Sequence, residues 1–393
     1  MAATPAPSSA RWAPLDVCMF RSLARTVKRW ASAVFYSRRM ELGTRRFLGL
    51  VVVALALCGC VLAPRSPASG SPSASAPSAS HPRPVVIDTD MAPDDWLAIL
   101  FLLGRPDVNV LAITVSGTGE GHCGPGVRNA IALIGLAGKT DIPVACGRET
   151  PLAGTHAFPE EWRARVDAHL GIPLATEPEN PSRDSAFDLM ASTLRASPEK
   201  VTVLTLGPLT NLADVLQQMP DLADRIGATF IMGGAVEVGG NVGASGLGIN
   251  NIVAEWNVYV DPAAAKAVLE AGVRATLVPL DATNHAPLSE AFAARLAGDA
   301  GSPSAKFASD VLTRLRASIA VGYFFWDPLA AAVLVDESLT AFESRGLSVV
   351  VDEGPESGRV ITNPDGPASR FATTADLGRL ETLLIDTLNG RNR

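Results

Sequence analysis

The sequence predicts an α/β protein with a mostly parallel, Rossmann-like sheet and helices on both of its faces. The first observation is an alternation, from about residue 85 onward, of short β-branched runs and longer stretches with helical apolar spacing. The second is size, because 393 residues of which 47% are apolar can bury a core on each side of one sheet. Ligands of such folds bind outside the carboxyl ends of the strands, so we expect the functional site there.

The expected strands are short runs rich in valine, isoleucine, leucine and threonine. They are expected at Val85–Asp88, Val110–Val115, Ile142–Ala145, Val201–Leu206, Thr229–Met232 and Ala275–Leu280. Apolar residues at helical spacing between and after these runs predict helices. The helices are expected at Asp95–Leu103, Val127–Ala137, Phe187–Arg195, Leu209–Gln218, Pro262–Ala271, Ala305–Ala320 and Pro328–Leu334. Strands that are joined through helices lie parallel to one another.

A cluster of carboxylates lies at the end of the first expected strand. Four acidic residues occur within eight positions there: Asp88, Asp90, Asp94 and Asp95. Asp88 and Asp90 are two apart, so their side chains are expected on the same face of an extended strand. Asp94 and Asp95 fall at the start of the following helix, where the helix dipole favours negative charge. Carboxylates this close repel one another unless a cation such as Ca²⁺ or Mg²⁺ lies among them. The alternative is a solvated acidic turn.

This segment resembles the opening motif of the inosine-uridine-preferring nucleoside hydrolases, in which Asp-Thr-Asp is followed, after three residues, by Asp-Asp. Residues 88–90 and 94–95 match that motif. Members of the family are calcium enzymes that hydrolyse the N-glycosidic bond of ribonucleosides. The resemblance implies that Asp90 is a calcium ligand and the general base, and that Asp95 is a second ligand. It also implies that Asp94 contacts the ribose 2′-hydroxyl.

Two later segments resemble calcium-binding parts of the same family. Residues 207–211, Gly-Pro-Leu-Thr-Asn, follow an expected strand, and the resemblance implies that the backbone carbonyl of Leu206 binds calcium. Without this context the segment would be an ordinary strand-to-helix turn. Residues 327–329 resemble the end of the family's His-Asp-Pro-Leu sequence, which implies that Asp327 binds calcium and meets the 3′-hydroxyl.

A block between residues 230 and 262 resembles the part of the family that holds the ribose. It carries Met-Gly-Gly, Gly-Asn, Ala-Glu-Trp-Asn and Asp-Pro in that order. The resemblance implies that Met232 packs on the sugar and that Asn241 and Glu255 take its 5′ side. Asn257 would share the 2′-hydroxyl with Asp94, since amides and carboxylates are suitable partners for hydroxyls. An insert rich in glycine and asparagine, residues 243–251, is expected to be a flexible loop over the site.

The residue before Asp327 bears on the choice of base. It is Trp326, whereas pyrimidine-accepting relatives carry a histidine there that is thought to protonate the leaving base. Purine-specific relatives carry tryptophan, and Trp256 also matches that branch. The resemblance implies that Trp326 stacks on a purine and eases protonation of its ring by solvent. The alternative is a core aromatic residue at a helix start, and no second stacking tryptophan is evident between residues 118 and 126.

One position of the site is left open between two residues. Relatives carry asparagine, or aspartate in the purine branch, at a position that meets the sugar and the attacking water. Counting forward from Gly117 selects Thr118, whereas counting back from Asn129 selects Glu120, which we favour. If neither residue serves, we expect weak activity or an atypical substrate.

The N-terminal 84 residues are expected to lie outside the catalytic domain, which we place at 85–393. Residues 1–39 are interpreted as an over-extended translation start or a disordered segment. Residues 40–60 have the charged, apolar and small-residue order of a secretory signal, and their end resembles a bacterial lipobox with Cys60 as the lipidated residue. Ordinary signal cleavage nearby is the alternative. Residues 61–84, rich in Ser, Ala and Pro, are expected to be a tether.

These features define the expected location and partners. We expect an exported lipoprotein on the outer face of the cytoplasmic membrane, held by its lipid alone, because the apolar run is shorter than the roughly 18 residues that a span needs. A net charge of −7 without a basic stripe argues against nucleic acid as a partner. The expected partner is a small-molecule nucleoside. A homo-oligomer stays open, as does a disulfide between Cys123 and Cys146.

Taken together, the motifs predict calcium-dependent hydrolysis of ribonucleosides, with purines preferred, to ribose and free base. The alternative is a non-catalytic nucleoside-binding lipoprotein, which would share the tether and the fold class. Binding alone would not require clustered metal-binding acids together with a general base. An aspartyl phosphotransferase is disfavoured, because Ala92 stands where that family has threonine or valine.

Replacing the expected lipidated residue tests the anchor. In Cys60→Ser the thiol that would carry the lipid is absent, so the protein should move from the membrane fraction to the soluble or secreted fraction. Immunoblotting of fractionated cells measures this, with Cys58→Ser as the matched control. Unchanged fractionation of the Cys60 variant would remove the lipid anchor.

Overall fold

The computed structural model describes residues 81–173 and 184–391. The expected segments 1–39 and 40–60, Cys60 included, lie outside the described residues, as does the expected tether up to residue 80. The first described strand begins at Arg83, two residues before the expected start of the domain. Among the described residues, every helix falls short of the length and apolar character that a membrane crossing requires.

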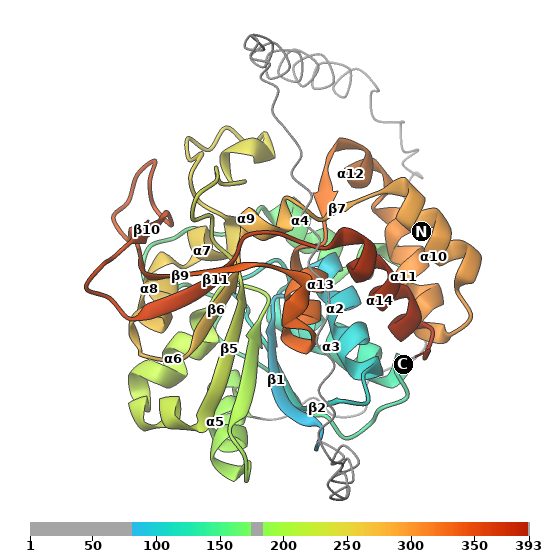
Figure 1. Ribbon diagram of the computed structural model, residues 1–393, viewed down its shortest axis with the longest axis horizontal. Helices are drawn as coiled ribbons and strands as arrows, with labels where there is room; N and C mark the ends of the chain where they lie inside the picture. Colours follow the sequence, from blue (N-terminus) through green and yellow to red (C-terminus); the bar gives the residue numbers. More distant parts are fainter. Residues whose placement is uncertain (1–80, 174–183, 392–393) are drawn as a thin grey trace, which may run out of the picture. The chain divides into compact units, whose positions relative to one another are not determined.

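A nine-stranded sheet forms the centre of the described chain (Figure 1). Its order is β10-β9-β11-β6-β5-β4-β1-β2-β3. Within it β9 runs antiparallel to its neighbours β10 and β11, and the other neighbours pair in parallel. The bounds are β1 Arg83–Thr89, β2 Val108–Val115, β3 Val144–Cys146, β4 Val201–Thr205, β5 Ile226–Met232, β6 Ala275–Val278, β9 Phe342–Val349, β10 Val360–Thr362 and β11 Ala368–Ala372. The predicted mostly parallel α/β fold is thus confirmed.

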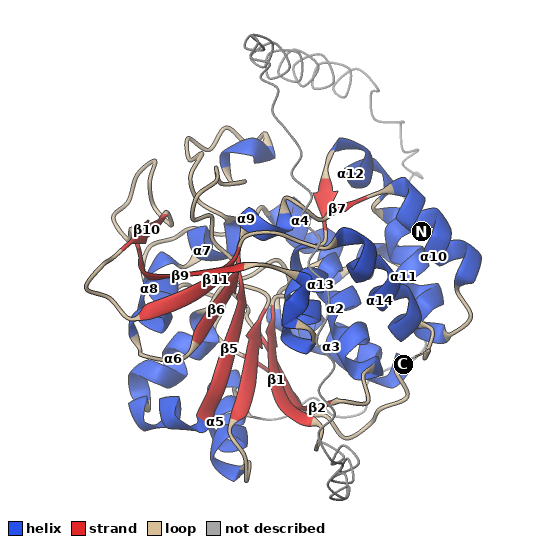
Figure 2. Ribbon diagram, viewed as in Figure 1, coloured by secondary structure: helices blue, strands red, loops and turns tan. Residues whose placement is uncertain are grey.

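Helices cover both faces of this sheet (Figure 2). In β1, Val85 and Ile87 belong to one buried apolar cluster, whereas Val86 belongs to the other, because successive side chains of a strand point to opposite faces. The first cluster includes residues of α2 (Pro93–Gly104), α3 (Cys123–Leu136), α11 (Pro303–Arg314), α13 (Trp326–Val335) and α14 (Leu377–Leu388). The second includes residues of α5 (Ala186–Ala196), α6 (Thr210–Gln218) and α8 (Pro262–Glu270).

The order of the strands reverses beside β1. From β1 the chain continues through β2 and β3 toward one edge of the sheet, whereas β4, β5 and β6 lie successively toward the other edge. The connections that leave β1 and β4 therefore diverge, and a crevice opens outside the carboxyl ends of these two strands. Asp90 directly follows β1 and Leu206 directly follows β4, so both stand at this crevice.

The structure differs from the expected elements mainly in the second half of the chain. The helix expected at Ala305–Ala320 is two helices, α11 and α12 (Arg316–Val321), which meet at the buried Leu315. No proline or glycine marks this break, so the apolar spacing could not reveal it. The elements that were not expected include β9 to β11, α14, α4 (Glu160–Asp167), α7 (Trp256–Val260), α9 (Leu280–Thr283), α10 (Glu290–Asp299) and a small antiparallel pair, β7 (Pro287–Leu288) with β8 (Tyr323–Phe324).

A disulfide joins Cys123, the first residue of α3, to Cys146, the last residue of β3. The two Cα atoms lie 5.4 Å apart. The pairing that the sequence left open is therefore present in the structure. It fastens the start of α3, and with it the end of the loop after β2, to the strand at the edge of the sheet.

Candidate active site

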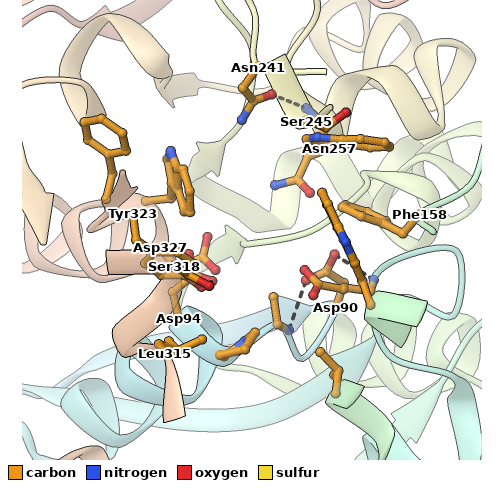
Figure 3. A pocket seen from close by; sticks show the side chains of 18 of the residues that line it. Asp90, Asp94, Phe158, Asn241, Ser245, Asn257, Leu315, Ser318, Tyr323 and Asp327 are labelled. Carbon is orange, nitrogen blue, oxygen red and sulfur yellow. Dashed lines mark hydrogen bonds between the residues drawn. The ribbon is translucent and has the colours of Figure 1, made fainter. Parts of the chain in front are cut away.

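A cavity of about 620 Å³ lies outside the carboxyl ends of β1, β4 and β5 (Figure 3). Its walls include eleven residues that the sequence singled out: Asp90, Asp94, Glu120, Leu206, Met232, Asn241, Glu255, Trp256, Asn257, Trp326 and Asp327. Asp95 does not line the cavity and is fully buried. Motifs far apart in the sequence are thus brought to one place by the sheet.

The turn after β1 directs Asp90 to the cavity. Met91 has a φ of 63°, in the left-handed region that residues other than glycine rarely occupy. Its amide donates to Thr89 Oγ1 at 3.0 Å, and the Thr89 hydroxyl donates to Asp95 Oδ1. The Asp90 amide donates to the same Asp95 oxygen at 3.2 Å. One oxygen of Asp95 therefore fixes a turn whose backbone strain is held by burial of Met91.

Asp90 lies between two glycines that allow the backbone to approach it closely. A Cβ added to Gly119 would lie 2.0 Å from Asp90 Cβ, and one added to Gly207 would lie 2.5 Å from the same atom. Backbone amides donate to both carboxylate oxygens, from Glu120 at 3.1 Å and from Ala92 at 3.4 Å. Burial raises the pKa of Asp90 to about 6, and the Glu120 amide opposes this rise. A carboxylate with a pKa near neutrality is suited to accept a proton.

Asp88 and Asp90 were expected on one face of a strand, but only Asp88 lies within β1. β1 ends at Thr89, and the left-handed residue that follows Asp90 turns the chain out of the strand. The Asp88 carboxylate instead accepts hydrogen bonds from Thr114 Oγ1 at 2.7 Å and from Asn211 Nδ2 at 2.8 Å. Asp88 therefore ties β1 to β2 and α6 behind the cavity and does not line it.

Three carboxylates converge beside Asp90. One oxygen each of Asp94, Asp95 and Asp327 lies within 4.8 Å of the others. Asp95 Oδ2 and Asp327 Oδ1 are buried and have no hydrogen-bond partner among the described residues. Burial first, and repulsion between neighbouring carboxylates second, raise the pKa of Asp95 and of Asp327 well above the usual range. Orphaned carboxylate oxygens in this arrangement fit a hard divalent cation such as calcium.

The geometry of this group differs in one member from the ligand set that the family resemblance implied. Asp94, which was assigned to the sugar, belongs to the group, whereas Asp90 does not. The Leu206 carbonyl, also an implied ligand, lines the cavity and accepts a hydrogen bond from Asn257 Nδ2 at 2.9 Å. A carbonyl oxygen has a second lone pair, so this bond leaves Leu206 able to face a cation.

The polar residues of the block 232–257 are fixed by backbone amides. Glu255 caps α7 and accepts from the amides of Gly234 at 2.9 Å, Asn257 at 2.9 Å and Val258 at 3.2 Å. Burial raises the pKa of Glu255 to about 7. Asn241 accepts from the Trp256 amide at 3.1 Å through Oδ1, so its Nδ2 group stays available to a ligand.

Thr118 and Glu120, between which the sequence left the choice open, differ in whether they line the cavity. Glu120 lines the cavity, and burial together with the nearby Asp90 and Asp94 raises its pKa well above the usual range. The Thr118 hydroxyl instead bonds to Thr210 Oγ1 at 3.0 Å, away from the cavity. Of the two candidates, Glu120 is the one able to touch a ligand.

Two aromatic walls contain Trp256 and Trp326, which the sequence singled out, and Phe158, Trp162 and Tyr323, which it did not. On one side Phe158 stacks on Trp256, with centroids 5.1 Å apart, and Trp162 of α4 contacts the same indole at 5.4 Å. On the other side Tyr323 meets Trp326 edge-on at 4.7 Å. Figure 3 shows Phe158 and Tyr323 at opposite sides of the cavity. The proximity of Tyr323 to the 327–329 motif was an available signal, whereas nothing in the spacing ties residues 158–162 to the site.

The insert at 243–251 lies at the cavity, where Ala244 and Ser245 contribute to the lining. It is anchored at its end, because Asn251 is buried and donates through Nδ2 to the Ser357 carbonyl at 2.7 Å. The Gly240 amide also donates to the Ile252 carbonyl at 2.8 Å. The loop is therefore positioned over the site as expected, and its base is held by hydrogen bonds.

Comparison with known proteins gives concordant matches over this domain. Residues 85–382 match the family model described as inosine-uridine preferring nucleoside hydrolase. The pyrimidine-specific ribonucleoside hydrolase of Citrobacter koseri is 37% identical over 206 residues, which are 52% of this chain and 62% of that protein. A protein of the same description from Escherichia coli O1:K1 is 36% identical over the same shares. The match thus spans less than two thirds of the length of these relatives.

Solved structures resemble a larger part of the chain. A plant nucleoside hydrolase has a TM-score of 0.70 and 28% identity, over 78% of this chain and 99% of its own. A purine-preferring ribonucleoside hydrolase from Gardnerella vaginalis has a TM-score of 0.68 and 26% identity, over 79% of this chain and 99% of its own. The relatives therefore include proteins named for pyrimidine and for purine specificity.

The buried acids predict that stability without a cation falls as the pH rises. Burial raises the pKa of Asp90 to about 6 and those of Asp88 and Glu255 to about 7. A carboxyl whose pKa is higher in the folded state stabilises the fold below its unfolded pKa, and this contribution is lost as the pH rises through the folded value. The Tm measured by calorimetry in chelator should therefore fall between about pH 5 and about pH 8.

Calcium should oppose this loss, because it binds the ionised carboxylates of the folded state. At a hundred times its Kd, a ligand adds about 2.7 kcal/mol to the free energy of unfolding. The gain in Tm on adding calcium should be larger at pH 8 than at pH 5, with magnesium at the same ionic strength as the control. A Tm that is independent of pH in chelator, and unmoved by calcium, would contradict the cation site.

Proposed function

Because the chain belongs to the inosine-uridine preferring nucleoside hydrolase family, we propose that it hydrolyses the N-glycosidic bond of ribonucleosides with calcium as cofactor and with purines as preferred bases. One observation carries the proposal. Buried carboxylates with unpartnered oxygens lie beside an aromatic cavity at the point where the strand order reverses. A charged floor and aromatic walls suit a ligand with a hydroxylated sugar at one end and a flat base at the other.

The cation would be held by Asp95, Asp327 and the Leu206 carbonyl, together with Asp90 or Asp94. The unpartnered oxygens of Asp95 and Asp327 support the first two assignments. When bound, calcium supplies neutralisation of the carboxylates and a lower pKa for a nearby water. Oxygen ligands alone, without histidine or cysteine, favour calcium over zinc at this place.

Asp90 is proposed as the general base. Water attacks the anomeric carbon of the ribose through an oxocarbenium-like state as the bond from that carbon to the base nitrogen breaks. Asp90 takes the proton of that water, and the departing base takes a proton from solvent. Its pKa of about 6 and its fixed orientation between two backbone amides support this role. General base catalysis contributes roughly 10²–10⁴-fold in rate. Unlike glycosidases that use two catalytic carboxylates, the site would work with one carboxylate and a cation.

The sugar hydroxyls are proposed to be held by the remaining polar lining. Asp94 and Asn257 would take the 2′-hydroxyl and Asp327 the 3′-hydroxyl, while Asn241 and Glu255 would take the 5′ side. Met232 would pack on the ring. Holding the substrate by several hydroxyls orients the anomeric carbon toward the attacking water, and this positioning lowers the entropic part of the barrier.

Purine preference is the finer part of the proposal. The cavity has Trp326 in one wall and Trp162 in the other, and a bicyclic purine offers both indoles more stacking area than a pyrimidine does. Trp162 supplies the second indole that the sequence did not reveal. The curated relatives are named pyrimidine-specific, whereas a structural relative is named purine-preferring, so base preference is a property to be measured on this chain.

Export with a lipid anchor at Cys60 stays part of the proposal. The disulfide between Cys123 and Cys146 supports an oxidising compartment, because disulfides persist there and are rare where thiols are kept reduced. The second candidate function is a nucleoside-binding lipoprotein without catalysis, which the aromatic cavity would equally suit.

A panel of nucleosides tests the function. Inosine, adenosine, guanosine and uridine are incubated with the calcium-loaded protein, and free ribose is measured. Ribose should appear, and Asp95→Ala should abolish both turnover and calcium binding, because a ligand with an unpartnered oxygen is lost. Asp107→Ala, at an exposed carboxylate, is the matched control. Binding of nucleosides without release of ribose would favour the non-catalytic candidate, and full turnover in verified absence of metal would refute the calcium requirement.

Replacing the indole before Asp327 tests base preference. Stacking contributes on the order of 0.5–1.5 kcal/mol beyond burial, which is about a factor of two to ten in rate. Trp326→Ala should lower kcat for purine nucleosides more than it changes the rate for p-nitrophenyl riboside, whose leaving group needs no proton. Wild-type kcat/KM should be higher for inosine than for uridine. Uridine turnover equal to that of inosine, or equal losses with both leaving groups, would refute the stacking role.

A further inference from the structure

Tyr323 connects the sugar end of the cavity to its base end. Its hydroxyl donates a hydrogen bond of 2.9 Å to Asp94 Oδ1, across 229 positions of sequence. Its ring meets the Trp326 indole edge-on, with centroids 4.7 Å apart and planes inclined by 67°. Figure 3 shows Tyr323, Asp94 and Asp327 together at one side of the cavity. No motif of the sequence assigned a role to this tyrosine.

The backbone holds Tyr323 in place before any ligand arrives. It lies in β8, where it pairs with Leu288 of β7. The Phe325 amide donates to the Ala286 carbonyl at 2.9 Å and closes the same small sheet. Gly322 precedes it with a φ of 118°, which a residue with a Cβ would rarely adopt, and turns the chain from α12 into this strand. Because the backbone already fixes Tyr323, its side chain loses little conformational entropy when its hydroxyl holds a partner.

The bond from Tyr323 decides how Asp94 is used. Asp94 lies in the group of three carboxylates that could share a cation, so its carboxylate has two competing uses. With Oδ1 engaged by the phenol, the plane of the carboxylate is set and Oδ2 is the oxygen left to a ligand. Without the phenol, both oxygens of Asp94 would be available to a cation shared with Asp95 and Asp327.

We propose that Tyr323 is a positioning residue that keeps Asp94 directed at the ribose 2′-hydroxyl, and that it thereby sets the preference for ribonucleosides over 2′-deoxyribonucleosides. This inference rests on the proposed function, since it concerns the same cavity. Tyr323 does not touch the reacting atoms. It acts through Asp94, and its ring contact with Trp326 fixes the position of that indole relative to the Asp94 carboxylate.

Tyr323→Phe removes the hydroxyl and keeps the ring. The ratio of kcat/KM for inosine to that for 2′-deoxyinosine should fall by about tenfold, because a hydrogen bond to a charged acceptor contributes about that much. The loss should fall on inosine, while the rate with 2′-deoxyinosine and the calcium Kd from titration calorimetry stay unchanged. Tyr259→Phe is the matched control, since its hydroxyl lies outside the cavity lining, and its ratio should equal that of the wild type.

A binding measurement separates this inference from the proposed function. Asp90→Asn removes the general base, so Kd values for inosine and 2′-deoxyinosine can be measured by calorimetry with and without Tyr323→Phe, whether or not the wild type turns over nucleosides. The ratio of the two Kd values should shrink when Tyr323 is replaced. Equal losses for both nucleosides would reduce Tyr323 to a structural residue and overturn the inference. A weaker calcium Kd with an unchanged ratio would overturn it too, because Asp94 would then serve the cation. Absence of free ribose from the wild type would refute only the proposed function.

Discussion

Five carboxylate side chains line one cavity, and a sixth, that of Asp95, is buried behind it. Burying an ionised carboxylate costs several kcal/mol unless charge or hydrogen bonds offset it. The chain offsets part of this cost with backbone amides, three of them on Glu255 and two on Asp90. The buried oxygens of Asp95 and Asp327 have no such partner among the described residues, and this cost is not offset by hydrogen bonds.

The need to hydrogen-bond these buried carboxylates accounts for the left-handed residue after β1 and for the close backbone approaches. The backbone approaches Asp90 closely at Gly119 and Gly207, where a Cβ would clash with the Asp90 side chain. Met91 must adopt a left-handed conformation for Asp95 to hold the turn through Thr89. The strain is local to the turn, whereas the parallel sheet beneath it is buried and largely apolar, so the sheet supports the strained turn.

Much of the floor of the site could be predicted from the sequence, because its residues follow strand ends that a parallel sheet brings together. The turn that takes Asp90 out of the strand could not, since it includes the left-handed Met91, two positions after the strand ends. The wall built from Phe158 and Trp162 could not either, because long connections carry no periodicity that reveals where they fold back. The break at Leu315 and the antiparallel strand β9 escaped for a similar reason, as tertiary contacts rather than local propensity determine them.

The two aromatic walls come from segments outside the central sheet: residues 158–162, before and at the start of α4, and residues 323–326, which include β8 and the first residue of α13. Substitutions in the wall at residues 158–162 can reshape the space for a base without changing the sheet beneath it, whereas Tyr323 bonds to Asp94 and so links the other wall to the charged floor. Changes in the base that the cavity accepts therefore require fewer substitutions than changes in the reaction that its carboxylates support. One set of carboxylates can thus be combined with different aromatic walls, each of which selects a different heterocycle.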